Sequence, residues 1–280
     1  MSRCALITGA SSGIGYELAK LFAREGCHTV LVARNEQKLS EVAQELRQFS
    51  GASVSVMPKD LTLPQAPDEL FAQLQREGLT VDVLVNNAGF GTHGPFAEAD
   101  LSVQREMMQL NMVALTHLTR LLLPGMIAQR AGKILNVAST AAFQPGPLMA
   151  VYYASKAYVL SFSEALANEL RGTGVTVTVL CPGPTRTNFQ RRAGVGDTLC
   201  LDSARHSSRA RQSRVEGLLG RSGVADAASV ARVGYDGLMA GRTVVVPGLR
   251  NRLLALSVRW LPRPLVVGAV RRIQEKRQPR

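Results

Sequence analysis

Hydrophobic and polar positions follow two alternating patterns along the chain. Short, nearly continuous apolar runs rich in β-branched residues predict buried strands at 3–9, 28–34, 53–62, 81–89, 133–139, 175–183 and 242–248. Stretches with apolar residues at helical spacing predict helices at about 14–25, 35–50, 67–78, 102–129, 151–171 and 226–240. Strands that alternate with helices, with few hairpin signals, predict a doubly wound parallel α/β sheet covered by helices on both faces.

No internal repeat is visible, and no linker divides the chain before residue 190. We therefore expect one domain over residues 1–248, followed by a basic amphipathic C-terminal segment at 249–280. A hydrophobic content of 46% with 19% charged residues is typical of a globular protein with a sizeable core.

Cysteine usage and hydropathy bear on the cellular compartment. The four cysteines show neither CxxC nor metal-ligand spacing, so we expect no disulfide scaffold and no metal site. The first residues lack a long apolar signal core, and no uninterrupted apolar run reaches the roughly 18 residues of a membrane span. These features favour a reducing, cytoplasmic location.

The formal net charge of +12 is unevenly distributed. Residues 1–190 hold 15 basic and 15 acidic residues, whereas residues 191–280 hold 18 basic and 6 acidic ones. Such asymmetry indicates either an anionic partner or a solvated arginine-rich surface, and the sequence does not decide between them. Nucleic acid is not expected as that partner, because the arginine-rich region lacks interleaved stacking aromatics.

Polar or conformationally special residues recur where the predicted strands end. They are Gly9, Arg34, Asp60, Asn86, Ser139 and Pro182. In doubly wound sheets, ligands bind beyond the carboxyl ends of the strands, so these positions predict a binding site. After the first strand, "TGASSGIG" places three glycines before a helix, where backbone N–H groups and the helix dipole can receive a pyrophosphate. This arrangement predicts a Rossmann-type nucleotide site.

The run "VYYASKAYVL" at 151–160 contains a candidate acid–base pair. Tyr152 and Lys156 are four residues apart and share one helix face, whereas Tyr153 points elsewhere. A nearby ammonium stabilises phenolate, so we expect Lys156 to lower the pKa of Tyr152 from its ordinary value of about 10. The alternative is that all three tyrosines of the run only pack in the core.

Six motifs in the correct order resemble the short-chain dehydrogenases/reductases. They are "TGASSGIG" at 8–15, "NNAG" at 86–89, Asn111, Ser139, Tyr152 with Lys156, and "PGPTRT" at 182–187. The resemblance covers residues 3–190 closely and extends less specifically to about 248. It implies a hydride-transferring oxidoreductase whose catalytic residues are Asn111, Ser139, Tyr152 and Lys156. Tyr153 and Tyr158 are then packing residues, and Asn86 is a brace between strands.

The resemblance also implies which residues hold a nicotinamide cofactor. They are Gly9, Ser11, Ser12, Gly13, Ile14 and Gly15 in the first turn, Asp60 and Leu61 beside the adenine, Asn87, Ala88 and Gly89 at the centre, Pro182, Gly183, Thr185 and Thr187 at the nicotinamide, and Tyr152 and Lys156 themselves.

The end of the second strand bears on the choice of cofactor. The family position for an acidic residue that binds the ribose diol of NAD is Ala33, and Arg34 follows with Lys38 one helical turn later. Cationic side chains suit a 2′-phosphate, so we expect NADP(H) rather than NAD(H). The alternative is that Arg34 is an ordinary surface residue.

The C-terminal third bears on substrate. The resemblance implies a substrate lid at 188–224, and this segment contains apolar residues and seven arginines. An apolar pocket with a basic rim suits a small hydrophobic ketone or secondary alcohol of lipid, acyl or steroid-like type. His93 either borders the substrate entrance or is a surface histidine. A catalytically idle nucleotide sensor and a lipid-surface binding protein are the alternative functions.

Residues 249–277 mix leucine, valine and the only tryptophan with arginines. "LPRP" at 261–264 is expected to break any helix there into two short pieces. Arginines interrupt the apolar run, which permits peripheral membrane contact without spanning. The alternatives are packing over the substrate pocket or against a second subunit, and we expect a homo-oligomer.

Overall fold

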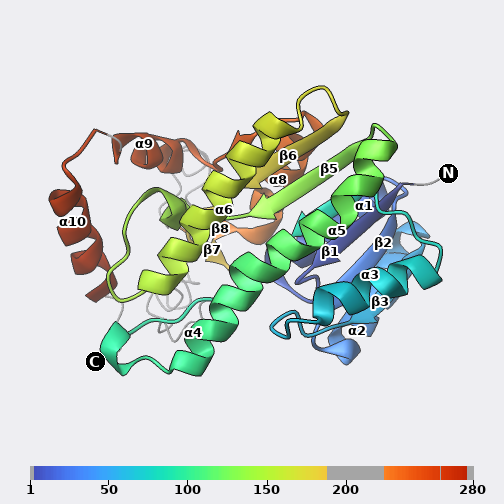
Figure 1. Cartoon of the computed structure of the whole chain (residues 1–280), viewed down its shortest axis with the longest axis horizontal. Coiled ribbons are helices and arrows are strands. Elements are labelled where there is room, and N and C mark those ends of the chain that lie inside the picture. Colours follow the sequence, from blue (N-terminus) through green and yellow to red (C-terminus); the bar gives the residue numbers. More distant parts are fainter. Residues whose placement is uncertain (1–2, 188–223, 259, 276–280) are drawn as a thin grey trace, which may run out of the picture.

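A computed structural model describes residues 3–187, 224–258 and 260–275. Its centre is a parallel sheet of seven strands in the order β3-β2-β1-β4-β5-β6-β9 (Figure 1). The strands are β1 (Cys4–Thr8), β2 (His28–Ala33), β3 (Val54–Pro58), β4 (Val83–Asn86), β5 (Gly132–Val137), β6 (Val175–Leu180) and β9 (Val244–Val245). The predicted doubly wound fold is confirmed, although most strands are shorter than their apolar runs.

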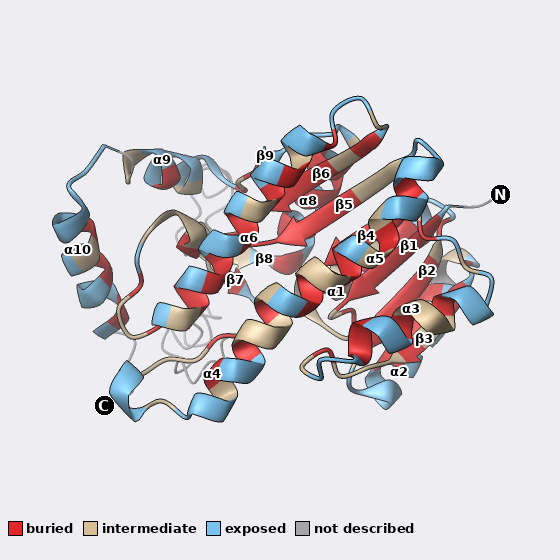
Figure 2. Ribbon diagram, viewed as in Figure 1, coloured by how far each residue is buried: buried red, intermediate tan, exposed pale blue. Residues whose placement is uncertain are grey.

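Helices cover both faces of this sheet. One face packs against α1 (Gly13–Arg24), α2 (Glu36–Ser50) and α8 (Ala227–Met239), and the other against α3 (Ala66–Arg76), α5 (Leu115–Ala128) and α6 (Ala150–Glu169). The strands read as continuous apolar runs because side chains on both faces are buried, as Figure 2 shows for the centre of the sheet.

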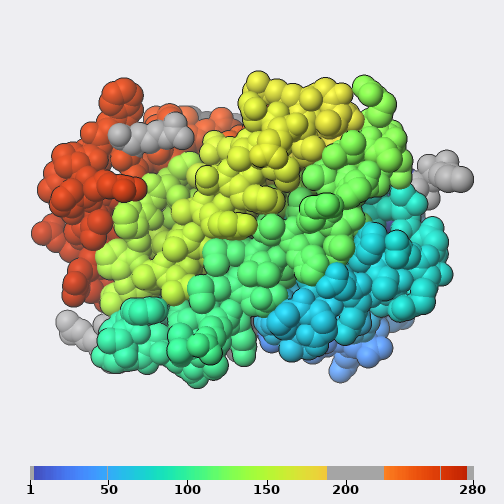
Figure 3. Space-filling view, in the orientation of Figure 1, coloured from blue at the N-terminus to red at the C-terminus, as the bar shows by residue number. Residues whose placement is uncertain are grey.

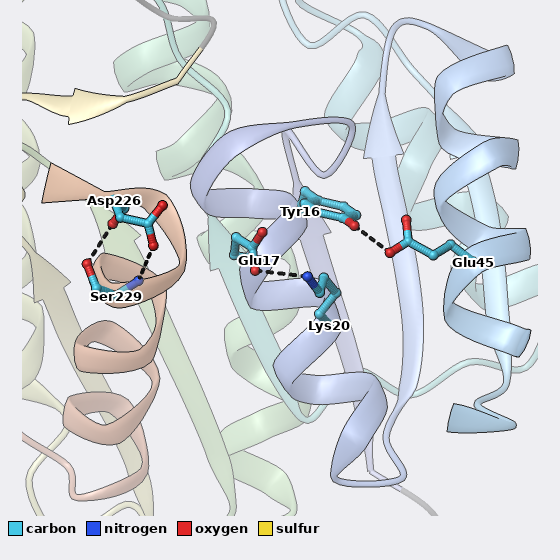
Figure 4. A network of polar contacts seen from close by, with 6 residues as sticks. All are labelled: Tyr16, Glu17, Lys20, Glu45, Asp226 and Ser229. Atoms are coloured by element: carbon cyan, nitrogen blue, oxygen red, sulfur yellow. Dashed lines mark hydrogen bonds and ion pairs between the residues drawn. The ribbon is translucent and has the colours of Figure 1, made fainter. Parts of the chain in front are cut away.

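Polar side chains on the helices of the first face form one contact between helices and two within them. The Tyr16 hydroxyl on α1 donates to Glu45 Oε1 on α2 over 2.5 Å, and Lys20 pairs with Glu17 within α1 (Figure 4). Asp226 caps α8 by accepting from the Ser229 N–H. The Tyr16–Glu45 contact joins α1 to α2, while buried apolar side chains such as Leu18 and Phe22 pack α1 against the sheet.

The predicted helix over 102–129 is not one regular helix. It consists of α4 (Leu101–Met108), a π-helical segment (Gln109–Ala114) and α5. The whole stretch Leu101–Ala128 is long enough to cross a membrane, and an 18-residue window within it has a mean hydropathy of 1.2. Leu118, Leu122 and Met126 pack against the sheet, however, so we assign the stretch to the core.

The C-terminal segment forms two helices, α9 (Leu249–Ser257) and α10 (Arg263–Glu275), separated at the predicted "LPRP" break. Figure 1 shows both at one end of the molecule, beyond the carboxyl ends of β5 and β6. A two-stranded parallel sheet of β7 (Thr185–Arg186) and β8 (Ala225–Asp226) lies before α8 in the chain. The predicted lid at 188–224 lies outside the described residues except for its last position.

Candidate active site

The glycine turn lies between β1 and α1, where the strand order of the sheet reverses. Gly13 begins α1 with a φ of +61°, a conformation that glycine adopts without strain. Ser12 is the N-cap residue, and its side chain makes no capping bond. The first N–H groups of α1 therefore remain available to an anion at the carboxyl edge of the sheet.

Close backbone approach explains another glycine of the turn. A Cβ at Gly15 would overlap the Gly9 carbonyl oxygen and Asn87 Nδ2. Asn87 Nδ2 donates to the Thr8 carbonyl over 2.9 Å, and the Asn87 and Ala88 N–H groups both donate to Thr8 Oγ1 over 3.0 Å. Thr8, which the sequence reading had not selected, thus joins the ends of β1 and β4.

Cationic side chains gather at the end of β2. Arg34 and Lys38 both line the cavity described below, as does Lys59, which the sequence reading missed. Asn35 caps α2 by accepting from the Lys38 N–H over 2.8 Å. Arg34 lies 3.8 Å from Asp60, and Asp60 Oδ1 accepts from the Thr62 N–H and hydroxyl. This rim suits a phosphate beside an adenosine moiety, with the buried Leu61 behind it.

Asn86 occupies a structural position, as the sequence suggested. Its Nδ2 donates to Thr119 Oγ1 over 3.1 Å and to Asn136 Oδ1 over 2.9 Å. Asn136 Nδ2 donates in turn to Ser163 Oγ. All four residues are buried. This chain of hydrogen bonds braces β4, β5, α5 and α6 beneath the site.

Ser139, Tyr152 and Lys156 meet at the carboxyl end of β5. The Ser139 and Tyr152 side chains share a hydrogen bond. Lys156 Nζ donates to the Val137 carbonyl over 2.8 Å and lies 5.9 Å from the centre of the Tyr152 ring. The i, i+4 spacing therefore brings the predicted pair together.

The prediction that Lys156 lowers the pKa of Tyr152 is wrong for this structure. Burial raises the pKa of Tyr152 to about 12, against a smaller lowering by the hydrogen bond from Ser139. Burial also lowers the pKa of Lys156 to about 8. Desolvation dominates because both side chains are buried. The Tyr152 phenol is consequently protonated at neutral pH and able to donate a proton.

Asn111 lies within the π-helical segment and joins three elements. Its Nδ2 donates to the Phe90 carbonyl over 2.9 Å and to Ser155 Oγ over 3.1 Å, and its Oδ1 accepts from the Phe90 N–H. A Cβ at Gly89 would lie 2.9 Å from Asn111 Oδ1 and 3.4 Å from Lys156 Nζ. The absence of that Cβ allows Asn111, Lys156 and the β4 loop to approach one another.

The "PGPTRT" segment closes the other side of the site. Thr185 Oγ1 donates to the Gly183 carbonyl over 2.9 Å. Thr187 lies against the glycine turn, because a Cβ at Gly13 would lie 3.0 Å from its methyl group. The chain after β6 thereby returns to the first turn of α1, and Pro182, Gly183, Thr185 and Thr187 all line the cavity.

One cavity of about 1000 Å³ connects these parts. It is lined at one end by Arg34 and Lys38, along its length by the glycine turn, Ser139, Tyr152 and Lys156, and elsewhere by apolar side chains of α9 and α10. Every cofactor or catalytic residue expected from the sequence lines it except Gly15, which contacts the turn from behind, and Asn111.

Gln274 and the valines of α10, which the sequence did not mark as functional, attach the C-terminal helix to the site. Gln274 Nε2 on α10 donates to the Tyr153 hydroxyl over 2.7 Å in a buried contact. His93 Nε2 lies 3.2 Å from the Gln274 carbonyl oxygen, so His93 contacts the tail rather than standing alone on the surface. Val266 and Val270 pack in one apolar cluster with Met149, Tyr152 and Tyr153. No local pattern signals contacts between residues this far apart in the chain.

The observed donors fit a nicotinamide dinucleotide. A helix N-terminus without a side-chain cap, glycines whose Cβ atoms would block the cradle, and a cationic rim lie along one cavity. The hydrogen-bonded side chains of Ser139 and Tyr152 border the same cavity. The fold and site thus define a nucleotide-dependent oxidoreductase.

Comparison with known proteins narrows that class. The family model described as short chain dehydrogenase matches residues 3–196. The chain belongs to the short-chain dehydrogenase/reductase family, as its motifs indicated. It is therefore an oxidoreductase of alcohols and ketones that uses a nicotinamide cofactor.

The chain is similar in sequence to relatives with different named activities. It is 35% identical to the ketoacyl reductase HetN of Nostoc sp. over 199 residues, covering 68% of this chain and 69% of the relative. It is 38% identical over 185 residues to 17-beta-hydroxysteroid dehydrogenase type 3 of Mus musculus, covering 65% of this chain but only 60% of the relative.

Solved structures resemble nearly the whole chain. A short-chain dehydrogenase from Sphingobium yanoikuyae in complex with NADPH has 32% identity and a TM-score of 0.77, with 91% of this chain and 92% of that chain covered. A bulky-bulky ketone specific alcohol dehydrogenase from Comamonas testosteroni has 28% identity and a TM-score of 0.73, with 92% of each covered. A family member from Burkholderia phymatum in complex with NAD has 28% identity and a TM-score of 0.75, again with 92% of each covered.

Proposed function

We propose that this protein uses NADPH to reduce a hydrophobic ketone to a secondary alcohol. The observation that carries the proposal is the composition of its cavity: a cationic rim at Arg34 and Lys38, a proton-donating centre at Tyr152, and an apolar wall from the C-terminal helices. The activities named for HetN, the steroid dehydrogenase and the ketone-specific dehydrogenase are in keeping with an apolar substrate.

When bound, the cofactor would supply the hydride. The remaining chemistry belongs to this chain. The Tyr152 hydroxyl donates its proton to the substrate oxygen as negative charge develops there, and Ser139 stabilises that charge by a hydrogen bond. Lys156, held by the Val137 carbonyl, places a cation near the phenol that loses its proton. Asn111 fixes the Phe90 backbone and Ser155 beside this group.

A panel of ketones tests the proposal directly. Loss of NADPH absorbance with bulky apolar ketones, and slower loss with small polar ones, is the expected result. A catalytically idle sensor or a protein that only binds lipid surfaces would bind NADPH or lipid without turnover of any ketone.

Arg34→Ala should reduce the preference for NADPH over NADH, because it removes a cation from the rim that faces the 2′-phosphate. Charge-assisted hydrogen bonds of this kind correspond to a change of about 10- to 100-fold in the ratio of kcat/KM values. Ala33→Asp should move the ratio in the same direction by repelling the phosphate. Arg76→Ala, an exposed arginine at the end of α3 and away from the cavity, is the matched control. An unchanged ratio in both Arg34→Ala and Ala33→Asp would contradict the assignment of NADP(H).

The kcat/KM for ketone reduction should be independent of pH up to about pH 8 and should decline above it. The pKa of Tyr152, raised to about 12, keeps the donor protonated throughout, whereas the pKa of Lys156, lowered to about 8, makes its charge present below that pH and absent above it. Measuring kcat/KM for reduction between mildly acidic and strongly basic pH checks this. A profile that instead rises through pH 8 would show that the deprotonated lysine is the active form.

A further inference from the structure

Helix α9 has two opposite apolar faces, of which the described chain uses one. Ala255 and Val258 line the cavity. Leu249, Leu253 and Leu256 recur at i, i+4 and i+7 and therefore share the opposite face, where they are 73%, 58% and 54% exposed. A surface helix ordinarily presents polar side chains on its outer face, so this second stripe is not explained by packing among the residues that the structure describes.

The residues that follow α9 extend the exposed apolar surface. Trp260 and Leu265 are 88% and 65% exposed and do not line the cavity. We call Leu249, Leu253, Leu256, Trp260 and Leu265 the outer apolar face. Figure 2 colours most residues of α9 as exposed, and Figure 3 shows that the C-terminal segment forms one end of the molecule. Eight of the fifteen exposed large apolar side chains of the described residues lie within residues 249–273. Three of them line the cavity, and the other five form the outer apolar face, a concentration that marks an interaction surface.

Basic side chains accompany this face. Arg250 and Arg252 are exposed and follow the leucine stripe on either side of it around the helix, and Arg263 begins α10. Residues 249–280 contain nine basic residues and one acidic residue. Exposed tryptophan, leucine and arginine together are the composition of segments that lie at the boundary between lipid acyl chains and anionic headgroups.

We propose that the outer apolar face attaches this protein peripherally to an anionic lipid surface, with the flanking arginines on the headgroups. A second copy of the chain fits this face less well, because a two-fold contact would bring the same arginines opposite one another. The proposal concerns the outside of α9 and is independent of the reaction in the cavity, so vesicle binding can be measured without turnover.

Trp260 supplies the probe, because it is the only tryptophan of the chain. Full-length protein is titrated with vesicles of phosphatidylcholine containing phosphatidylglycerol, and with vesicles of phosphatidylcholine alone. The expected result is a blue shift of Trp260 emission and quenching by brominated acyl chains with the anionic vesicles, both reversed by high salt. No spectral change and no co-sedimentation with anionic vesicles at low salt would overturn the proposal.

A matched pair of variants locates the contact. Leu253→Glu combined with Leu256→Glu should lower the partition coefficient for anionic vesicles at least about tenfold, since two apolar contacts are lost and like charge is added. Leu101→Glu makes the same change at a side chain that is 56% exposed on α4, and it should bind as the wild type does. Equal losses in both would show that another surface binds the lipid. A wild-type dimer that binds no vesicles and that the double variant dissociates, in sedimentation equilibrium, would instead identify a subunit interface.

Discussion

Tyr152→Phe is expected to reduce kcat for ketone reduction by about 10²- to 10⁴-fold, the usual contribution of a positioned general acid. The substitution removes only the phenolic hydroxyl, which shares a hydrogen bond with Ser139 at the carboxyl end of β5. The ring keeps its packing with Met149 and Tyr153, so affinity for NADPH should remain within a few-fold. Steady-state kinetics give kcat, and quenching or enhancement of NADPH fluorescence gives the dissociation constant.

Tyr153→Phe is the matched control, since it removes the same atom from the adjacent residue. Its kcat should stay close to that of the wild type. The change leaves the buried amide of Gln274 without its hydrogen-bond partner, which is expected to lower the free energy of unfolding by about 1–3 kcal/mol. Thermal unfolding measures that loss. Comparable losses of kcat in both variants would contradict the assignment of the proton donor to Tyr152.

The parts of the site that the sequence predicts are those governed by local geometry. Tyr152 and Lys156 share a helix face because a helix has 3.6 residues per turn, and the glycine turn follows a buried strand for reasons of backbone conformation. Parallel strands place their carboxyl ends at one edge, which is why residues as distant as Gly9 and Ser139 line one cavity. The sheet and the place of the site at this edge could therefore be predicted from the sequence pattern, whereas the roles of Asn111 and Ser139 rest on the resemblance to the family.

Three-dimensional packing decides the features that the sequence did not predict. The pKa of Tyr152 is raised rather than lowered because burial outweighs the hydrogen bond with Ser139, and the extent of burial follows from tertiary contacts. The bond between Gln274 and Tyr153 joins residues 121 apart, without a motif at either. The sequence pattern of residues 249–277 allowed this segment to cover the pocket, to pack against a second subunit or to lie on a membrane. The structure shows that its inner side chains line the cavity, while its outer side chains remain exposed.

Gly15→Ala should weaken NADPH binding at least about 100-fold, the effect of losing two charge-assisted hydrogen bonds to a phosphate. A Cβ at this position would overlap the Gly9 carbonyl oxygen and Asn87 Nδ2. Because the first of these is backbone, the turn itself must move, and it carries the N–H groups that face the cavity. The affinity is measured by NADPH fluorescence titration, with thermal unfolding as a check that the domain stays folded.

Gly125→Ala provides the control for a methyl group added to a helical glycine. Gly125 lies in α5, and a Cβ there meets no atom within 4 Å. Alanine is a better helix former than glycine by about 1 kcal/mol, so this variant should be as stable as the wild type or more so, with unchanged NADPH affinity. If Gly15→Ala bound NADPH as tightly as Gly125→Ala, the first turn of α1 would not be the phosphate site. The anion would then have to be held by the cationic side chains at the end of β2 alone.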